Sequence, residues 1–147
     1  MRNIQNILFF ILLLLSINYS KAQKTGEIVV KINGCKLEKG KIIVALVNNE
    51  TSYLSEEIVP YIYSYIRNSA KPKTHYDCLF RNIHFGTYVI QVFYDKNDNN
   101  VLDTSFGFPK EKYGFSNNAR GNFSKPDYED VCFVLNQNQL TQQITIK

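Results

Sequence analysis

The sequence predicts an antiparallel β-sandwich of immunoglobulin-like or transthyretin-like type, with about seven strands and one long loop. Three observations lead to this fold class. Short runs rich in β-branched and aromatic residues are separated by turn residues. No long stretch has the spacing of an amphipathic helix. The chain that follows a predicted leader also has the length of one domain.

Six runs are predicted to be strands, and their bounds are 27–33, 41–47, 75–80, 87–94, 130–135 and 142–146. In the first run, Ile28, Val30 and Ile32 alternate with polar residues, so one face is expected to be buried. The second run is apolar on both faces, which predicts a central position in a sheet. Gly34 and Gly40 mark the turns that bound these two strands.

The stretch 51–70 fits two structures. A helical stripe and a row of alternate tyrosines overlap in it; their members are Ile58, Ile62 and Tyr65, and Tyr61, Tyr63 and Tyr65. Short apolar runs do not separate helix from strand, and we expect an extended or mixed connection. The tyrosine row is suited to stacking on a sugar ring, but packing in the core or at a sheet edge is the simpler expectation.

The first twenty-two residues are predicted to be a secretory signal peptide. Arg2 supplies a positive start, residues 7–15 are apolar, and Ser20 and Ala22 place small residues before a cleavage site at Gln23. The apolar run is shorter than the roughly 20 residues that cross a bilayer. We therefore expect an exported, periplasmic or secreted protein with one domain over 23–147 and no transmembrane segment after cleavage.

Charge and composition restrict the partners. The formal net charge is +4, and the predicted leader carries two of the basic residues, Arg2 and Lys21. The rest of the chain has no cluster of Lys and Arg of the kind that binds nucleic acid, so we exclude nucleic acid as a partner. An envelope protein or a glycan remains as the expected kind of partner.

The three cysteines, Cys35, Cys78 and Cys132, allow two interpretations. They are either small buried side chains or, since export permits disulfides, one pair is bonded and one thiol is left over. The sequence does not choose among the three pairings. No CxxC or CxxH spacing indicates zinc.

The segment that follows the clearest strand is the densest cluster of oxygen ligands in the chain. Asp95, Asn97, Asn99 and Asp103 have the spacing of positions 1, 3, 5 and 9 of a calcium loop, and Val101 could add a backbone carbonyl at position 7. Glu111 is the expected substitute for the missing carboxylate at position 12. The sequence therefore predicts a candidate Ca²⁺ site.

Turn chemistry is the alternative interpretation of the same residues. Asp and Asn side chains often accept hydrogen bonds from their own backbone in Asx-turns. Asn100 stands where a calcium loop usually has Gly, and Phe106 stands where it has its bidentate carboxylate. Both the calcium and the Asx-turn interpretations stay open at this point.

The next stretch, 107–118, contains Gly, Pro and Asn residues that prevent a regular element, and aromatic residues that argue against disorder. Four aromatic residues are expected to anchor it as a small satellite core: Phe106, Phe108, Tyr113 and Phe115. Ser116, Asn117 and Asn118 would then display hydrogen-bonding groups. Tyr113, Phe115 and these three residues form the predicted ligand surface of the loop.

These residues resemble a known family. The stretches that carry the resemblance are 85–88, Asp95-x-Asn97-x-Asn99-x-x-x-Asp103, 107–118 and 126–130. Together they look like the bacterial exported family called domain of unknown function 2141, over about residues 26 to 147. The resemblance implies an envelope protein with a β-sandwich fold and no assigned catalytic activity. Tyr94, where a His is usual, and Asn100, where a Gly is usual, depart from the family pattern.

No catalytic motif is found in the chain. His75 and His84 are the only histidines, and no nucleophile elbow, zinc-protease motif or phosphate loop is present. We therefore expect a non-enzymatic envelope module that binds or is structural, with its loop organised by turn chemistry or Ca²⁺. A carbohydrate- or small-ligand-binding module is the second hypothesis. A hydrolase using Asp95, Asp103 and Glu111 is the third.

Overall fold

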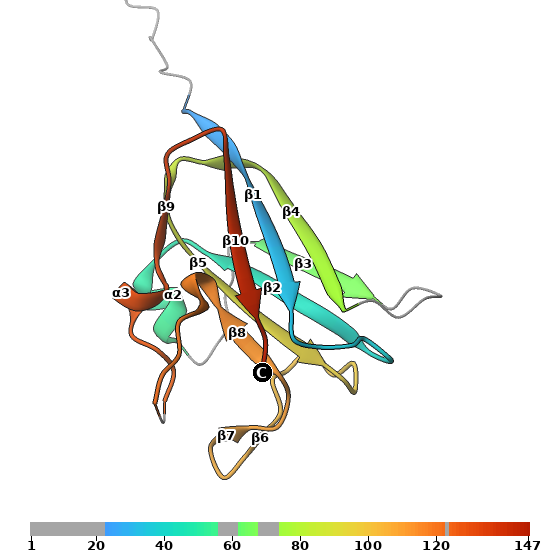
Figure 1. Cartoon of the computed structure of the whole chain (residues 1–147). Coiled ribbons are helices and arrows are strands. Elements are labelled where there is room, and N and C mark those ends of the chain that lie inside the picture. The colour runs from blue at the N-terminus through green and yellow to red at the C-terminus, as the bar shows by residue number, and fades with distance from the viewer. Residues whose placement is uncertain (1–22, 56–61, 68–73, 123) are drawn as a thin grey trace, which may run out of the picture.

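The computed structural model describes residues 23–55, 62–67, 74–122 and 124–147, with only the backbone of 62–65. Two β-sheets lie face to face and enclose the main core (Figure 1). This confirms the predicted all-β, sandwich-like fold class. The predicted signal peptide lies outside the described residues, so export and the start of the domain stay predictions.

The first sheet has three strands in the order β10–β1–β4. β1 is Thr25–Asn33, β4 is His75–His84 and β10 is Gln139–Thr145. β1 pairs with β4 in the antiparallel sense and with β10 in the parallel sense. The C-terminal strand is therefore held beside the first strand by a parallel pairing, the exception in a mainly antiparallel fold.

The second sheet has the order β3–β2–β5–β8, with β9 also paired to β5. Its strands are β2 (Lys41–Val47), β3 (Ile62–Arg67), β5 (Gly86–Asp95), β8 (Tyr113–Phe115) and β9 (Phe133–Leu135). β2 pairs with β5 over its whole length, so that Lys41 lies opposite Asp95. This register places the end of β5, where the polar loop begins, beside the start of β2.

The burial pattern follows the sequence. Ile28, Val30 and Ile32 of β1 are fully buried, as their alternation predicts, and all seven residues of β2 are buried. A second, smaller cluster lies beside the main core; it contains Val47, Tyr53, Val89, Phe115 and Val131. The second cluster is where the short helices join the sandwich.

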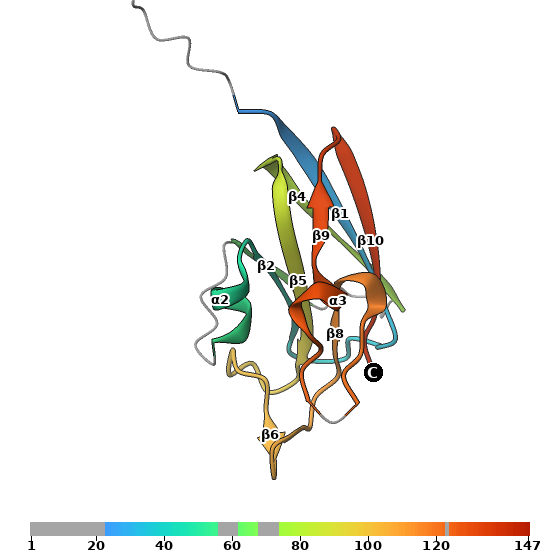
Figure 2. The same cartoon turned by 90° about the vertical axis from the view of Figure 1, so that its left-hand side faces the viewer.

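The remaining elements are short: α2 (Glu50–Leu54), the 3-10 turn η1 (Ser116–Asn118), α3 (Tyr128–Val131), β6 (Thr104–Ser105) and β7 (Phe108–Pro109). The Asn49 side chain caps α2 by accepting from the Ser52 N–H at 2.8 Å. β6 and β7 form a hairpin that projects beyond one end of the sandwich (Figures 1 and 2).

Several predicted bounds need adjustment. The run 130–135 begins as helix α3, and only Phe133–Leu135 is strand; the predicted strand 75–80 extends to His84. The stretch 51–70 contains both α2 and β3, in agreement with a mixed connection. Tyr61 and the side chains of Tyr63 and Tyr65 lie outside the described residues, so the stacking platform stays a prediction.

The three cysteines carry free thiols in the described part of the chain. Cys35 and Cys78 are buried in the main core cluster, and Cys132 is partly buried. Burial raises the pKa of the Cys35 thiol. The structure thus agrees with the interpretation of small buried side chains. Among residues that the structure describes, no helix has the length and apolar character needed to cross a membrane.

Candidate functional site

Asp95, the last residue of β5, organises the polar loop that follows it. Its side chain is fully buried. Oδ1 accepts a hydrogen bond from the Asn99 N–H at 3.0 Å, and Oδ2 accepts one from the Asn100 N–H at 2.8 Å. Asn100 has a φ of +66°, a left-handed conformation that Asn tolerates better than most residues. The loop therefore folds back onto the end of the strand that leads into it.

A buried lysine lies beneath this loop. Lys41 is only 3% exposed, its Nζ is 3.3 Å from Asp95 Oδ2, and it donates to Asp98 Oδ1. Arg67 Nη1 lies 3.1 Å from the other oxygen of Asp98. Hydrogen bonds from Lys41 and Arg67 lower the pKa of Asp98, and the bond to Asp98 raises the pKa of Lys41. The protein thus supplies its own cation to two acidic residues of the loop.

Three residues of this site were not predicted from the sequence: Lys41, Asp98 and Arg67. They come from three separate segments, and only the strand register brings them together: Lys41 pairs with Asp95 on one side and with Arg67 on the other. A lysine among apolar residues at the start of a predicted central strand was the available signal, because an isolated buried charge needs a partner.

Asp103 closes the loop through two amide side chains. Asn97 Nδ2 donates to Asp103 Oδ2 at 2.8 Å, and Asn99 Nδ2 donates to Oδ1 at 2.9 Å. The amide oxygens of the same asparagines accept from the backbone, Asn97 from the Asn99 N–H and Asn99 from the Val101 N–H. These are the short-range contacts of Asx-turns.

Glu111 joins the loop to the chain that returns from the hairpin. Its Oε1 accepts from the Lys96 N–H at 2.7 Å and its Oε2 accepts from the Asp103 N–H at 3.2 Å. One carboxylate therefore fixes both ends of the loop. The structure thus brings Glu111 into contact with the backbone of the predicted loop, and its predicted role as a calcium ligand stays a prediction.

The observed contacts are those of turn chemistry. The carboxylate and amide oxygens described above accept hydrogen bonds from N–H groups of the loop. In the described part of the chain, no group of three or more His, Cys, Asp or Glu side chains is placed to hold a metal ion. The backbone carbonyl of Val101 has no assigned role, and its side chain is exposed. Calcium binding stays a prediction.

The hairpin exposes two large aromatic side chains. Phe106 is fully exposed and Phe108 is 59% exposed, so the expectation that both anchor a satellite core is wrong. Phe106 and Gly107 form the two-residue turn, with φ values of +50° and +80°. Such turns favour Asn-Gly, because a side chain like that of Phe is disfavoured at positive φ. In the sequence, the available sign of this unusual turn was a Phe, in place of the usual Asn, directly before Gly107.

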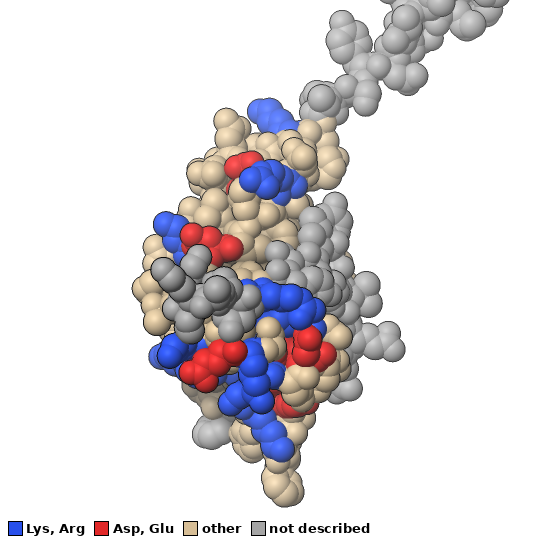
Figure 3. All heavy atoms as spheres, turned by 90° about the vertical axis from the view of Figure 1, so that its right-hand side faces the viewer, with Lys and Arg blue, Asp and Glu red and all other residues tan. Residues whose placement is uncertain are grey.

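Exposed lysines surround the base of the hairpin. Lys39, Lys96, Lys110 and Lys112 are all exposed. The turn at Gly40 lies directly against the backbone of Asp95 and Lys96, which places Lys39 near the loop. Figure 3 shows Lys and Arg side chains, with acidic ones between them, gathered close to the uncharged tip of the molecule.

The second half of the predicted segment is packed into the protein. Tyr113 and Phe115 lie at the second core cluster with their rings edge to face, as the satellite-core expectation required. Ser116 is fully buried: its hydroxyl accepts from the Ile90 N–H at 3.0 Å and donates to the Val131 carbonyl. Phe115 and Ser116 therefore have almost no exposed surface to offer a ligand.

Asn117 and Asn118 are exposed, but their amides are used within the protein. Both have a positive φ. Asn117 Nδ2 donates to the carbonyls of Asp130 and Cys132, and Asn118 Oδ1 accepts from the Thr145 N–H at 2.8 Å. These contacts tie η1 to α3 and to β10. Their predicted role as ligand-binding groups has no support in these contacts.

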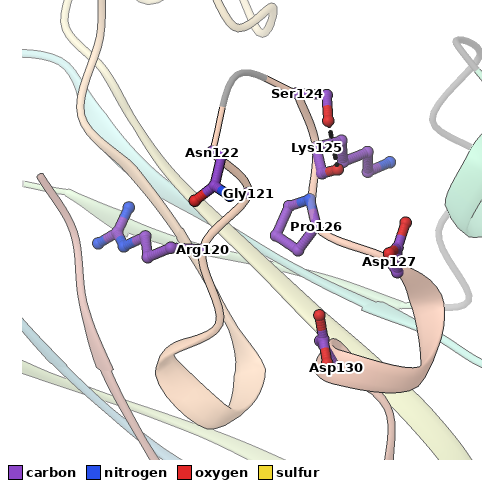
Figure 4. Close-up of a pocket in the computed structure, with 8 residues that line it drawn as sticks. All are labelled: Arg120, Gly121, Asn122, Ser124, Lys125, Pro126, Asp127 and Asp130. Carbon is purple, nitrogen blue, oxygen red and sulfur yellow. Dashed lines mark hydrogen bonds between the residues drawn. The ribbon is translucent and has the colours of Figure 1, made fainter.

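A shallow hollow of about 340 Å³ lies beside the chain from Arg120 to Asp130. Figure 4 shows that Arg120 and Lys125 point away from each other on opposite sides of this loop. Arg120 donates to the Tyr113 carbonyl, and Lys125 donates to the Tyr53 carbonyl and lies over its ring. Burial lowers the pKa of Lys125. Both cations are committed to packing, and we assign this hollow no ligand.

Comparison with known proteins supports the family assignment. Residues 30–143 match the model of a family described as "Uncharacterized protein conserved in bacteria (DUF2141)". The chain belongs to this family. No curated protein and no solved structure matches the chain. The matched region of this DUF2141 member includes the polar loop, the hairpin and most of both sheets.

Proposed function

We propose that the protein is an exported, non-catalytic binding module that presents the β6–β7 hairpin to a partner in the cell envelope. The observation that carries the proposal is Phe106, a fully exposed aromatic residue with a positive φ at the tip of a projecting hairpin. Strained residues that surrounding structure maintains are concentrated at functional positions.

The base of the hairpin supports this proposal, because it is held on both sides. The Lys110 N–H donates to the Asp103 carbonyl at 2.8 Å, and the Tyr94 N–H donates to the Lys112 carbonyl at 2.8 Å. Glu111 adds two hydrogen bonds between the returning chain and the loop. A hairpin held in this way keeps its exposed aromatic residues in one orientation, which lowers the entropic cost of binding.

Photo-crosslinking tests the proposal. A benzophenone amino acid replaces Phe106 in one variant and Val134 in a matched control, since Val134 is also an exposed apolar residue but lies on β9, away from the hairpin. We expect irradiation of the intact producing bacterium to give a discrete adduct from position 106 and none from position 134. Equal labelling from both positions, or neither a protein nor a lipid adduct from position 106, would contradict the proposal.

A calcium-dependent loop is a second candidate, because the predicted ligands Asp95, Asn97, Asn99 and Asp103 lie within one loop and Glu111 reaches it from the returning chain. Calorimetric titration with Ca²⁺, compared between the wild type and Asp103→Ala, tests it. Heat that the substitution removes would support calcium as the organiser of the loop. No heat from the wild type would leave the Asx-turns and Lys41 as its organisers.

A further inference from the structure

The tip of the hairpin is apolar and convex. Phe106 and Phe108 are exposed on it, and Val101, which is 60% exposed, lies on the polar loop just before the hairpin. Both views of the fold show the hairpin projecting beyond the sheets (Figures 1 and 2). A projecting apolar tip needs a partner that surrounds it, either a preformed pocket or a surface that deforms.

The charges around the tip select between these two kinds of partner. Among the residues that the structure describes, Lys96 and Lys110 are exposed and their side chains form no hydrogen bond or ion pair, whereas Lys41 and Arg67 are paired with acidic residues of the loop. Glu111 and Asp103 direct their carboxylates onto amide groups inside the loop. The acidic side chains of the loop are thus paired with cations or N–H groups, Asp98 included, and the unpaired charges beside the apolar tip among the residues described above are those of Lys96 and Lys110.

From this combination we infer that the hairpin inserts into an anionic lipid surface, with Phe106 and Phe108 in the headgroup region and Lys96 and Lys110 against acidic headgroups. Apolar side chains next to Lys and Arg are the pattern that holds proteins at a membrane interface. Anionic lipids attract each nearby lysine, and the attraction falls with salt. The inference rests on the proposed function, because it names the partner of the same hairpin.

Vesicle binding tests the inference, and the fluorescence of one introduced Trp reports on the hairpin tip. The sequence contains no Trp, so Phe106→Trp introduces a single indole at the tip, and Val134→Trp places one on β9 as a control. The probes are vesicles of phosphatidylcholine alone and of phosphatidylcholine mixed with phosphatidylglycerol. With the mixed vesicles we expect the Phe106→Trp variant to co-sediment and its emission to shift to the blue. The emission of the Val134→Trp variant is expected to stay unshifted.

Substitutions then assign the effect to named groups in the otherwise wild-type chain. Phe106→Ser with Phe108→Ser is expected to weaken sedimentation about tenfold or more, because two apolar side chains no longer enter the interface. Lys96→Gln and Lys110→Gln are each expected to weaken it about fivefold. The melting temperature of every variant shows whether the fold is intact, which we expect because all four side chains are exposed.

Equal binding to both kinds of vesicle, unchanged binding by the double Phe variant, or an unshifted emission of the Phe106→Trp variant would overturn the lipid inference. If that emission does not respond and position 106 still forms a protein adduct in cells, the lipid inference fails and the proposed function stands. If position 106 forms no adduct of any kind and binds no vesicle, both fail.

Discussion

The two halves of the segment from Asp95 to Asn118 contain similar residues, but one half projects into solvent and the other packs against the core. The first half, from Asp95 to Glu111, projects from the sandwich, is closed by polar contacts, and exposes Phe106 and Phe108. The second half, from Tyr113 to Asn118, lies against the second core cluster. In the first half, hydrogen bonds hold the backbone so that apolar groups face water. In the second half, apolar packing and hydrogen bonds act together, and both hold the chain against the core.

This difference shows that the aromatic content of a loop does not determine whether it is packed or presented. What distinguishes the halves is the strand beside them. Tyr113 pairs with Phe93 and Phe115 with Gln91, so β8 is an edge strand of the second sheet. The hairpin has no pairing to either main sheet in the described part of the chain. A series of substitutions can measure how much each half contributes to stability.

The largest expected effect is in the packed half. Ser116→Ala removes the hydroxyl that joins the Ile90 N–H to the Val131 carbonyl, and both groups become buried without their partner. We expect the free energy of unfolding to fall by about 2–3 kcal/mol, measured by urea denaturation. The control Thr104→Ala, an exposed residue of the hairpin, is expected to change it by less than about 0.5 kcal/mol. A similar loss in both variants would remove the contrast between the halves.

A smaller effect is expected for the cation beneath the projecting half. Lys41→Met leaves Asp95 buried without its ion-pair partner, although the Asn99 and Asn100 N–H groups still bind it. We expect the melting temperature to fall by roughly 5 °C, and hydrogen exchange of these two amides to become faster. The control is Lys112→Met, which removes an exposed lysine that binds the Gly34 carbonyl. Equal shifts for Lys41→Met and Lys112→Met would show that the buried cation has no special role.

The tip is expected to respond in the opposite direction. Phe106→Asn places at φ +50° a residue that tolerates this conformation. We expect the free energy of unfolding to rise by about 1 kcal/mol, while binding by the hairpin falls. Phe108→Asn, at a position outside the turn, is the control and is expected to give no gain in stability. A loss of stability with Phe106→Asn would mean that the aromatic ring is a structural group and not a presented one.

Most of the fold could be predicted from local patterns. Alternation in β1 and the continuous apolar run of β2 indicated the buried faces, since burial depends on residues close in the sequence. The parallel pairing of β10 with β1 could not be predicted, because it joins the two ends of the domain. Helix α3 ends within the run 130–135 that was predicted to be a strand, because four residues carry too short a pattern to identify a helix.

The candidate site could be predicted only within single stretches of sequence. The spacing of Asp95, Asn97, Asn99 and Asp103 indicated where the polar loop lies, and Glu111 contacts that loop; the calcium role predicted for these residues stays a prediction. The Lys41–Asp98–Arg67 contacts depend on the register of three strands. The exposure of Phe106 and the burial of Ser116 depend on where the loop lies relative to the sheets, which no local pattern contains.

The smallest expected effect concerns Asp98, which should make the projecting half of the segment more sensitive to acid than the packed half. Hydrogen bonds from Lys41 and Arg67 lower the pKa of Asp98 from its ordinary value of 3.8. A lowered pKa in the folded state contributes stability that is present above this ordinary value and is lost as the pH falls through the folded-state pKa. Because Asp98 is 45% exposed, solvent screens the contribution and salt reduces it.

We therefore expect acid to loosen the projecting half first. As the pH is lowered from about 5 to below 4, the protection factors of the Asn99 and Asn100 amides, which compare each exchange rate with that of an unfolded amide at the same pH, should fall, while the Ile90 amide held by Ser116 stays protected. Asp98→Asn should remove most of this pH dependence, because an amide cannot gain the proton. If the Asp98→Asn loop loosens over the same pH range as the wild type, another acidic residue is responsible, and Asp95→Asn, Asp103→Asn and Glu111→Gln, tested one at a time, identify it.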